Sequence, residues 1–285
     1  MQALIFDCDG VILESEELHR LAYNAAFAHF DVVVENEFGV AEWSQTYYDV
    51  LQNQVGGGKP KMRHFFGQEG WPTSTVTKGV AKSDADQTLL IDTLQEWKSQ
   101  HYQDMIGSGE VECRPGVLRM MDEARAAGLK LAVCSAGTKS SIIFSLKSLL
   151  GEARFQALDL FLAGDDVDKK KPDPEIYALA AQRLGLDPKA CVVIEDSTIG
   201  LAAARGAGMR CIITYTSSTV SQAFPGAERI VCDLGSYPVN VTVAELMAAR
   251  IVQDDRVNLT VSPDGDAVYF HMTDEEEENQ KRGLA

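Results

Sequence analysis

Positive charge is scarce in this sequence. Its 285 residues include 26 lysines and arginines against 42 aspartates and glutamates, which gives a formal net charge of -16. A general binding surface for nucleic acids or for anionic membranes would be repelled by that charge, so neither partner is expected. An anionic substrate would have to be held by a local group of basic side chains.

The sequence also lacks the patterns of a disulfide framework, a zinc site and a membrane span. Its 6 cysteines are widely spaced with no C-x-x-C pair, and most stand in apolar stretches where cysteine acts as a small buried side chain. No apolar run approaches the roughly 18 residues that a spanning helix needs. Met1 leads directly into an apolar run, so we expect any leader peptide to be absent or removed. Reduced thiols in a reducing compartment are expected.

Short apolar runs alternate with helical patterns along most of the chain. Buried strands are predicted within ALIFDCDG near the start, at 129–137, at 191–200, at 209–216 and at 229–235. Between them, apolar residues at i, i+3 and i+4 spacing predict helices, most of which end at a glycine. This alternation predicts an α/β fold with a doubly wound parallel sheet. Ligands of such sheets bind beyond the carboxyl ends of the strands.

A second domain is predicted inside the first. Residues 14–111 contain no comparable strand runs and show amphipathic helical patterns, which indicates an inserted α-helical cap. The core domain then comprises residues 1–13 and 112–252, and the hinges lie where the chain enters and leaves the cap. Residues 253–285 are predicted to form a C-terminal extension, with a hairpin around Pro-Asp-Gly-Asp and then an acidic, disordered tail.

Acidic residues follow two of the predicted strands. Asp7 and Asp9 are separated by one residue and therefore point to the same side, while Glu195 and Asp196 end another strand. Burying such charges is costly unless they are paired or bind a metal ion. One aspartate alone would be typical of turn capping, but four acids at one edge of a sheet indicate an oxygen-rich site suited to Mg²⁺. We therefore predict Mg²⁺ as the cofactor, with these four acids as its ligands.

Two further residues suit a phosphoryl group. Ser135 ends a predicted strand just before Gly137, where a hydroxyl and backbone N–H groups can cradle an anion, although a simple turn is the alternative. Lys171 is the last of three consecutive lysines and directly precedes Pro172, which disfavours the helical region for Lys171 and holds it extended. Its ammonium group would neutralise charge on a phosphoryl group. A solvated lysine run is the alternative.

Four of these segments resemble the motifs of the haloacid dehalogenase superfamily. They are DCDGV, the Ser135 after LAVC, the lysine of KKPDPEIY, and VIEDSTIGLAAARGAG. The resemblance covers roughly residues 1–235. Within the predicted cap, ESEELHR and GGGKPKMRHFF resemble the CbbY-like sugar-phosphate phosphatases, among them xylulose-1,5-bisphosphate phosphatases. The resemblance implies a Mg²⁺-dependent phosphatase acting on xylulose-1,5-bisphosphate or a similar pentulose bisphosphate, in the plastid stroma of a photosynthetic eukaryote or otherwise in the cytoplasm.

The resemblance also implies a role for each motif residue. Asp7 would be the nucleophile that forms an aspartyl-phosphate. Asp9 would act first as general acid and then as general base. Its backbone carbonyl would bind Mg²⁺ with the side chains of Asp7 and Asp196, and Glu195 would either bind the ion directly or contact those ligands. The groups that hold the transferring phosphoryl would be Ser135, the amides of Ala136 and Gly137, and Lys171.

Substrate selection is expected to depend on the predicted cap. Glu16 stands in the family's position for an acid that faces the substrate, although an acid favoured at a helix N-terminus is an equal alternative. Lys59, Arg63 and His64 follow three glycines, and we predict that they clamp a second phosphate, against the alternative of a solvated basic helix end. Two more candidates are Arg114, at the second hinge, and Tyr48, which otherwise belongs to the core.

The sequence disfavours three other functions. A phosphomutase related to β-phosphoglucomutase would share this core, but the Thr-Arg-Lys element of those mutases is not found in the sequence. A dehalogenase is disfavoured because halide displacement does not need the acid and base that Asp9 supplies. A catalytically inactive binding module is disfavoured because every motif is intact. No long apolar strand or heptad pattern indicates an obligate partner chain, so a monomer is expected.

Overall fold

The computed structural model describes residues 1–34, 39, 41–235, 241–248, 253–254, 259–261 and 268–270. The chain divides into two compact units. Unit 1 comprises residues 1–12, 114–139 and 157–285, and unit 2 comprises residues 13–113 and 140–156. Among the described residues, no helix combines the length and the apolar character needed to cross a membrane.

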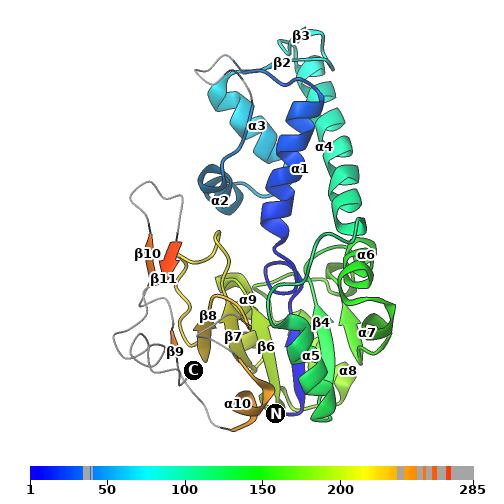
Figure 1. Ribbon diagram of the computed structural model, residues 1–285, viewed down its shortest axis with the longest axis vertical. Coiled ribbons are helices and arrows are strands. Elements are labelled where there is room, and N and C mark those ends of the chain that lie inside the picture. Colours follow the sequence, from blue (N-terminus) through cyan, green and yellow to red (C-terminus); the bar gives the residue numbers. More distant parts are fainter. Residues whose placement is uncertain are drawn as a thin grey trace. The chain divides into compact units, whose positions relative to one another are not determined.

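Unit 1 is built on a parallel sheet with the strand order β5-β4-β1-β6-β7-β8-β9 (Figure 1). The predicted α/β fold with a doubly wound parallel sheet is confirmed. Two strands of this sheet were not predicted: β5, whose three residues are too short to stand out as an apolar run, and β9. The strands are β1 (Ala3–Phe6), β4 (Lys130–Cys134), β5 (Leu160–Leu162), β6 (Cys191–Glu195), β7 (Arg210–Thr214), β8 (Arg229–Val231) and β9 (Gln253–Asp254).

Helices cover both faces of this sheet. Helices α8 (Glu175–Leu184) and α9 (Thr198–Gly206) pack on one face, in a cluster that takes alternate residues from the strands. Helix α5 (Val117–Ala126) packs against β4 on the other face, together with α10 (Val243–Ala248). Because successive strand residues point to opposite faces, a sheet covered in this way needs continuous apolar runs. Burial of both faces of the sheet therefore explains the continuous apolar runs from which the strands were predicted.

Unit 2 is mainly helical. Aromatic side chains fill its core, where the ring centroid of Phe27 lies 5.1 Å from that of Trp43 and 5.8 Å from that of Phe66. Burial of such large rings supplies much of the apolar area that a small helical unit needs. Its elements are α1 (Ser15–His29), α2 (Gln45–Gln54), α3 (Gly58–Glu69), β2 (Thr73–Ser74), β3 (Gly79–Val80), α4 (Asp84–Gly107), α6 (Lys139–Leu150) and α7 (Glu152–Gln156).

The domain boundaries drawn from the sequence stay a prediction. Residues 140–156 group with unit 2, whereas the sequence suggested that the insertion ends at residue 111. In the C-terminal extension, β10 (Leu259–Val261) and β11 (Val268–Phe270) pair antiparallel. The acidic tail that follows lies outside the described residues.

Candidate active site

The ammonium group of Lys171 lies among acids from two neighbouring strands. Its Nζ atom is 2.5 Å from Asp7 Oδ1 and 2.7 Å from Glu195 Oε1, and it also donates to the carbonyl of Cys134 at 3.1 Å. The side chain of Lys171 is only 7% exposed. Burial lowers the pKa of Lys171, but Asp7 and Glu195 outweigh that effect and raise it above its ordinary value. Lys171 therefore stays positively charged.

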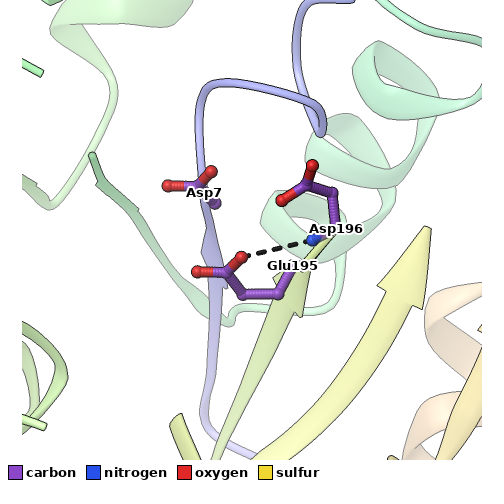
Figure 2. Close-up of side chains that lie close together, drawn as sticks. All are labelled: Asp7, Glu195 and Asp196. Atoms are coloured by element: carbon purple, nitrogen blue, oxygen red, sulfur yellow. Dashed lines mark hydrogen bonds between the residues drawn. The ribbon is translucent and has the colours of Figure 1, made fainter. Parts of the chain in front are cut away.

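Three carboxylates meet at the carboxyl ends of β1 and β6. One oxygen from each of Asp7, Glu195 and Asp196 lies within 4.8 Å of the others, and Figure 2 shows the three side chains gathered around one point. Burial raises the pKa of Asp7 to about 8, against the opposing effect of Lys171 and with a further contribution from Glu195. Burial and Glu195 also raise the pKa of Asp196 well above its usual range. This group of acids is thus short of positive charge, which suits a cation.

Asp9 and Ser135 come together at the ends of β1 and β4. Ser135 is buried, and its hydroxyl donates to Asp9 Oδ2 at 3.4 Å. The same hydroxyl accepts a hydrogen bond from the Gly137 N–H at 3.1 Å. The Asp9 carboxylate is partly exposed, unlike that of Asp7. Ala136 turns its carbonyl toward Lys170 Nζ, at 3.4 Å. The predicted phosphoryl-binding residues after β4 therefore lie beside Asp9.

Tyr177 belongs to this site, although it was not predicted from the sequence. Its buried hydroxyl donates to Glu195 Oε1 at 2.5 Å, and its ring centroid lies 5.0 Å from Lys171 Nζ. Glu195 Oε2 accepts the N–H of Asp196 at 3.2 Å, so both oxygens of Glu195 accept hydrogen bonds. The signal in the sequence was a tyrosine near the start of the helix after KKPDP. That position is equally typical of an ordinary core residue.

Arg114 directs its guanidinium group at backbone carbonyls. It donates to the carbonyls of Gly10, Thr214, Tyr215 and Cys232. Neutral carbonyls occupy the donors that a phosphate would otherwise use. Its predicted part in a phosphate clamp stays a prediction, and the structure gives that role no added support.

The predicted clamp residues of unit 2 lie on α3. Lys59 Nζ is 2.8 Å from Asp92 Oδ1, and both side chains are about half exposed. Arg63 donates to Thr88 Oγ1 at 3.1 Å and is exposed, while His64 is partly buried. Lys59 and Arg63 are thus engaged with residues of α4, in contacts that a competing phosphate could replace.

A second polar group is buried within unit 2. The Tyr48 hydroxyl donates to Glu16 Oε2 at 3.0 Å and lies 3.5 Å from Lys61 Nζ. Nearby on α1 and α4, Lys98 Nζ lies 2.8 Å from His19 Nδ1. Burial lowers the pKa of Lys98 to about 7, although Glu16 opposes the shift, and burial lowers the pKa of Lys61 as well. The structure therefore brings the predicted Glu16 and Tyr48 together with basic residues other than those predicted.

Lys98 could have been found from the sequence. It follows Ile91 and Leu94 on the buried stripe of α4, where the helical period places an apolar residue. A lysine at such a position is rare unless it has a partner. Lys61 gave a weaker signal, because it stands among other basic residues in GGGKPKMRHFF.

Comparison with known proteins decides the family. Residues 1–208 match the family model of the haloacid dehalogenase-like hydrolases. The chain belongs to this family. A haloacid dehalogenase-like hydrolase domain-containing protein of Arabidopsis thaliana is 59% identical over 237 residues, which are 83% of this chain and 75% of that protein. Protein CbbY of Rhodobacter capsulatus is 34% identical over 236 residues, which are 83% of this chain and 95% of that protein.

A solved structure agrees with these sequence relatives. A mutant of CbbY from Rhodobacter sphaeroides, in complex with xylulose-(1,5)bisphosphate, has a TM-score of 0.62 and 30% identity, covering 84% of this chain and 97% of that one. The predicted family, the CbbY-like resemblance within it and the class of enzyme, a phosphatase, are confirmed.

Proposed function

We propose that this phosphatase depends on Mg²⁺ and hydrolyses a small sugar phosphate, with xylulose-1,5-bisphosphate or a similar pentulose bisphosphate as the first candidate. The observation that carries the proposal is the convergence of Asp7, Asp196 and the Lys171 ammonium at adjoining strand ends. The choice of sugar draws on the CbbY structure that contains xylulose-(1,5)bisphosphate.

The acids of this site fit a magnesium ion. Hard carboxylate oxygens are the ligands that Mg²⁺ prefers, and it usually binds through one or two carboxylates together with substrate phosphate. Asp7 and Asp196 would hold the ion, with the backbone carbonyl of Asp9. Glu195 would stand beside them, since its oxygens already accept bonds from Lys171, Tyr177 and the Asp196 N–H. When bound, Mg²⁺ would offset the negative charge of the phosphoryl group.

Asp7 would attack the phosphorus and form an aspartyl-phosphate, releasing the sugar. Lys171, which holds Asp7 Oδ1 at 2.5 Å, would orient this carboxylate and stabilise the charge on the transferring group. Glu195 would keep Lys171 protonated and in place. Because Lys171 is buried, little water competes for its charge.

Asp9 would act as the general acid and the general base. Its carboxylate is the less buried of the two aspartates on the DCDG segment, so it can exchange protons with the sugar and with water. It would donate a proton to the leaving sugar oxygen and later take one from the water that hydrolyses the aspartyl-phosphate. Ser135 and the amides of Ala136 and Gly137 would hold the phosphoryl oxygens. In unit 2, Glu16 and Tyr48 are proposed sugar contacts, and Lys59, Arg63 and His64 remain the proposed clamp for a second phosphate.

A phosphate-release screen tests the proposal. Pentulose and hexose monophosphates and bisphosphates are supplied with Mg²⁺ or with a chelator, and both inorganic phosphate and isomerised sugar phosphate are measured. We expect inorganic phosphate from a pentulose bisphosphate, only with Mg²⁺, and loss of at least about a thousandfold in turnover for Asp7→Asn. Isomerised sugar without phosphate release would indicate a mutase. Full turnover by Asp7→Asn would contradict the mechanism.

A further inference from the structure

The guanidinium group of Arg114 ties together three separate segments of unit 1. One nitrogen, Nη1, donates to the carbonyl of Gly10, in the turn after β1, and to that of Thr214, at the end of β7. The other, Nη2, donates to the carbonyl of Tyr215 at 2.8 Å and to that of Cys232, after β8, at 2.6 Å. The backbone N–H of Arg114 donates to the carbonyl of Ile12 at 2.9 Å. A planar fork with several donors is the side chain suited to such a task.

The Asp196 side chain lies close to Gly10. The φ of Gly10 is +76°, and a Cβ atom built there would lie 2.2 Å from Asp196 Oδ2. The turn that follows Asp9 is therefore pressed against one of the proposed metal ligands. Glycine restrains its own backbone less than any other residue, so the path of this turn has to be set by its neighbours. Within the turn, the N–H groups of Val11 and Ile12 donate to the Cys8 carbonyl at 3.4 and 2.9 Å. The bond from Arg114 to the Gly10 carbonyl adds a restraint from outside the turn.

Arg119 shows what a purely structural arginine looks like in the same unit. It donates to the carbonyls of Leu234 and Val241 at 2.7 and 2.8 Å and pairs with Glu123. Like Arg114, it ties the C-terminal part of unit 1 to the segment around α5. The carbonyls that it holds do not belong to the turn after Asp9. The two arginines thus form a matched pair that differs in its contact with the proposed active site.

We propose that Arg114 is a positioning residue of this phosphatase: by holding the Gly10 carbonyl, it sets the turn after Asp9 against Asp196 and so presets the spacing of the metal-binding oxygens. This inference rests on the proposed Mg²⁺-dependent function. Arg114 does not touch the reacting atoms in this role. Its positioning effect passes through the backbone at Gly10, and its positive charge separately opposes the rise that burial causes in the pKa of Asp196.

The test compares Arg114→Lys and Arg114→Gln with Arg119→Lys and Arg119→Gln. Each protein is titrated with Mg²⁺ alone by calorimetry, and with Mn²⁺ alone by electron paramagnetic resonance, in the absence of substrate. Loss of groups that orient metal ligands costs about 10- to 100-fold in metal affinity, and we expect a loss of this size for both Arg114 variants. We expect kcat to fall more than KM rises. The Arg119 variants should lower the melting temperature but keep metal affinity within about twofold of wild type.

Metal affinity and kcat within about twofold of wild type in Arg114→Lys would overturn the inference, as would equal losses of metal affinity in the Arg119 variants. If Arg114→Gln fails to fold, Arg114→Lys decides the test, because lysine keeps the positive charge but lacks the several donors of the planar guanidinium group. A wild-type protein that binds no divalent ion would overturn both the proposed function and this inference. A Mg²⁺-dependent wild type with an unaffected Arg114→Lys would overturn the inference alone.

Discussion

Lys171 Nζ lies 2.5 Å from Asp7 Oδ1, although 164 residues separate the two along the chain. Both side chains are less than a tenth exposed. Removing one partner of such a buried pair leaves the other charge uncompensated, which is costly. The proposed nucleophile and its lysine therefore depend on each other for both stability and chemistry.

Replacing Lys171 with methionine should remove activity and lower stability. We expect kcat to fall by about 100- to 1,000-fold, because the charge that faces the phosphoryl group is lost. Unfolding should become easier by about 3–5 kcal/mol in the absence of metal, since Glu195 loses its charged partner and Asp7 loses a hydrogen-bond donor. Steady-state kinetics and urea unfolding measure the two effects. Lys170→Met is the control, because Lys170 is exposed in the same lysine run; equal effects of both variants would contradict the assignment.

Replacing Tyr177 with phenylalanine should have a smaller effect on the same site. The change removes the hydroxyl that donates to Glu195 at 2.5 Å and leaves the buried ring in place. A hydrogen bond to a charged group is worth about 1.5–3 kcal/mol, and we expect a loss of stability in that range. We expect kcat to fall by about tenfold with little change in KM. Tyr47→Phe is the control, because the buried Tyr47 hydroxyl has no hydrogen-bond partner among the described residues.

Metal-free protein should lose stability as the pH rises toward 8. Burial raises the pKa of Asp7 to about 8, so the folded protein holds a proton that the unfolded chain releases between its ordinary pKa of 3.8 and that value. The unfolding free energy therefore falls as pH rises through this window. Since Mg²⁺ binds the ionised carboxylate, its stabilising effect should grow over the same window.

Thermal unfolding with EDTA or with Mg²⁺, at about pH 6 and about pH 8, measures this effect. We expect a larger Mg²⁺-induced rise in melting temperature at the higher pH. Asp196→Asn removes one of the proposed ligands and should abolish most of the rise at both values. A rise that is the same at the two pH values would show that the acids of the site do not hold the ion.

Unit 2 should respond to pH with the opposite sign. Burial lowers the pKa of Lys98 from 10.5 to about 7, so between these values the unfolded chain binds a proton that the folded unit lacks. The contribution of Lys98 to the unfolding free energy therefore rises with pH, by at most about 1.4 kcal/mol per pH unit. The Lys98→Met variant lacks this pH dependence of the unfolding free energy. The stability of the variant relative to wild type should therefore decline from about pH 7 to about pH 9.

Tryptophan fluorescence during urea unfolding reads out this prediction. All 3 tryptophans, Trp43, Trp71 and Trp97, belong to unit 2. Lys82→Met is the matched control, because Lys82 is exposed in the same unit. A parallel pH dependence of wild type and Lys98→Met would show that Lys98 titrates as it does in the unfolded chain.

The sequence by itself determined the parallel sheet and the residues at the ends of its strands. Continuous apolar runs can be buried only between two layers of helices, and the carboxyl ends of parallel strands meet at one edge. The meeting of Asp7, Glu195 and Asp196 follows from those two rules. Lys171 could be selected from its run because Pro172 restricts its backbone.

Only the tertiary structure decided which partners the long side chains reach. Tyr177 meets Glu195, and Arg114 meets the carbonyl of Gly10. Lys98 is buried beside His19. Local patterns record the period of a helix or strand, which says where a side chain leaves the backbone. They do not record which distant segment lies a few ångströms away, and for lysine, arginine and tyrosine that neighbour determines the charge, the hydrogen bonds and the role.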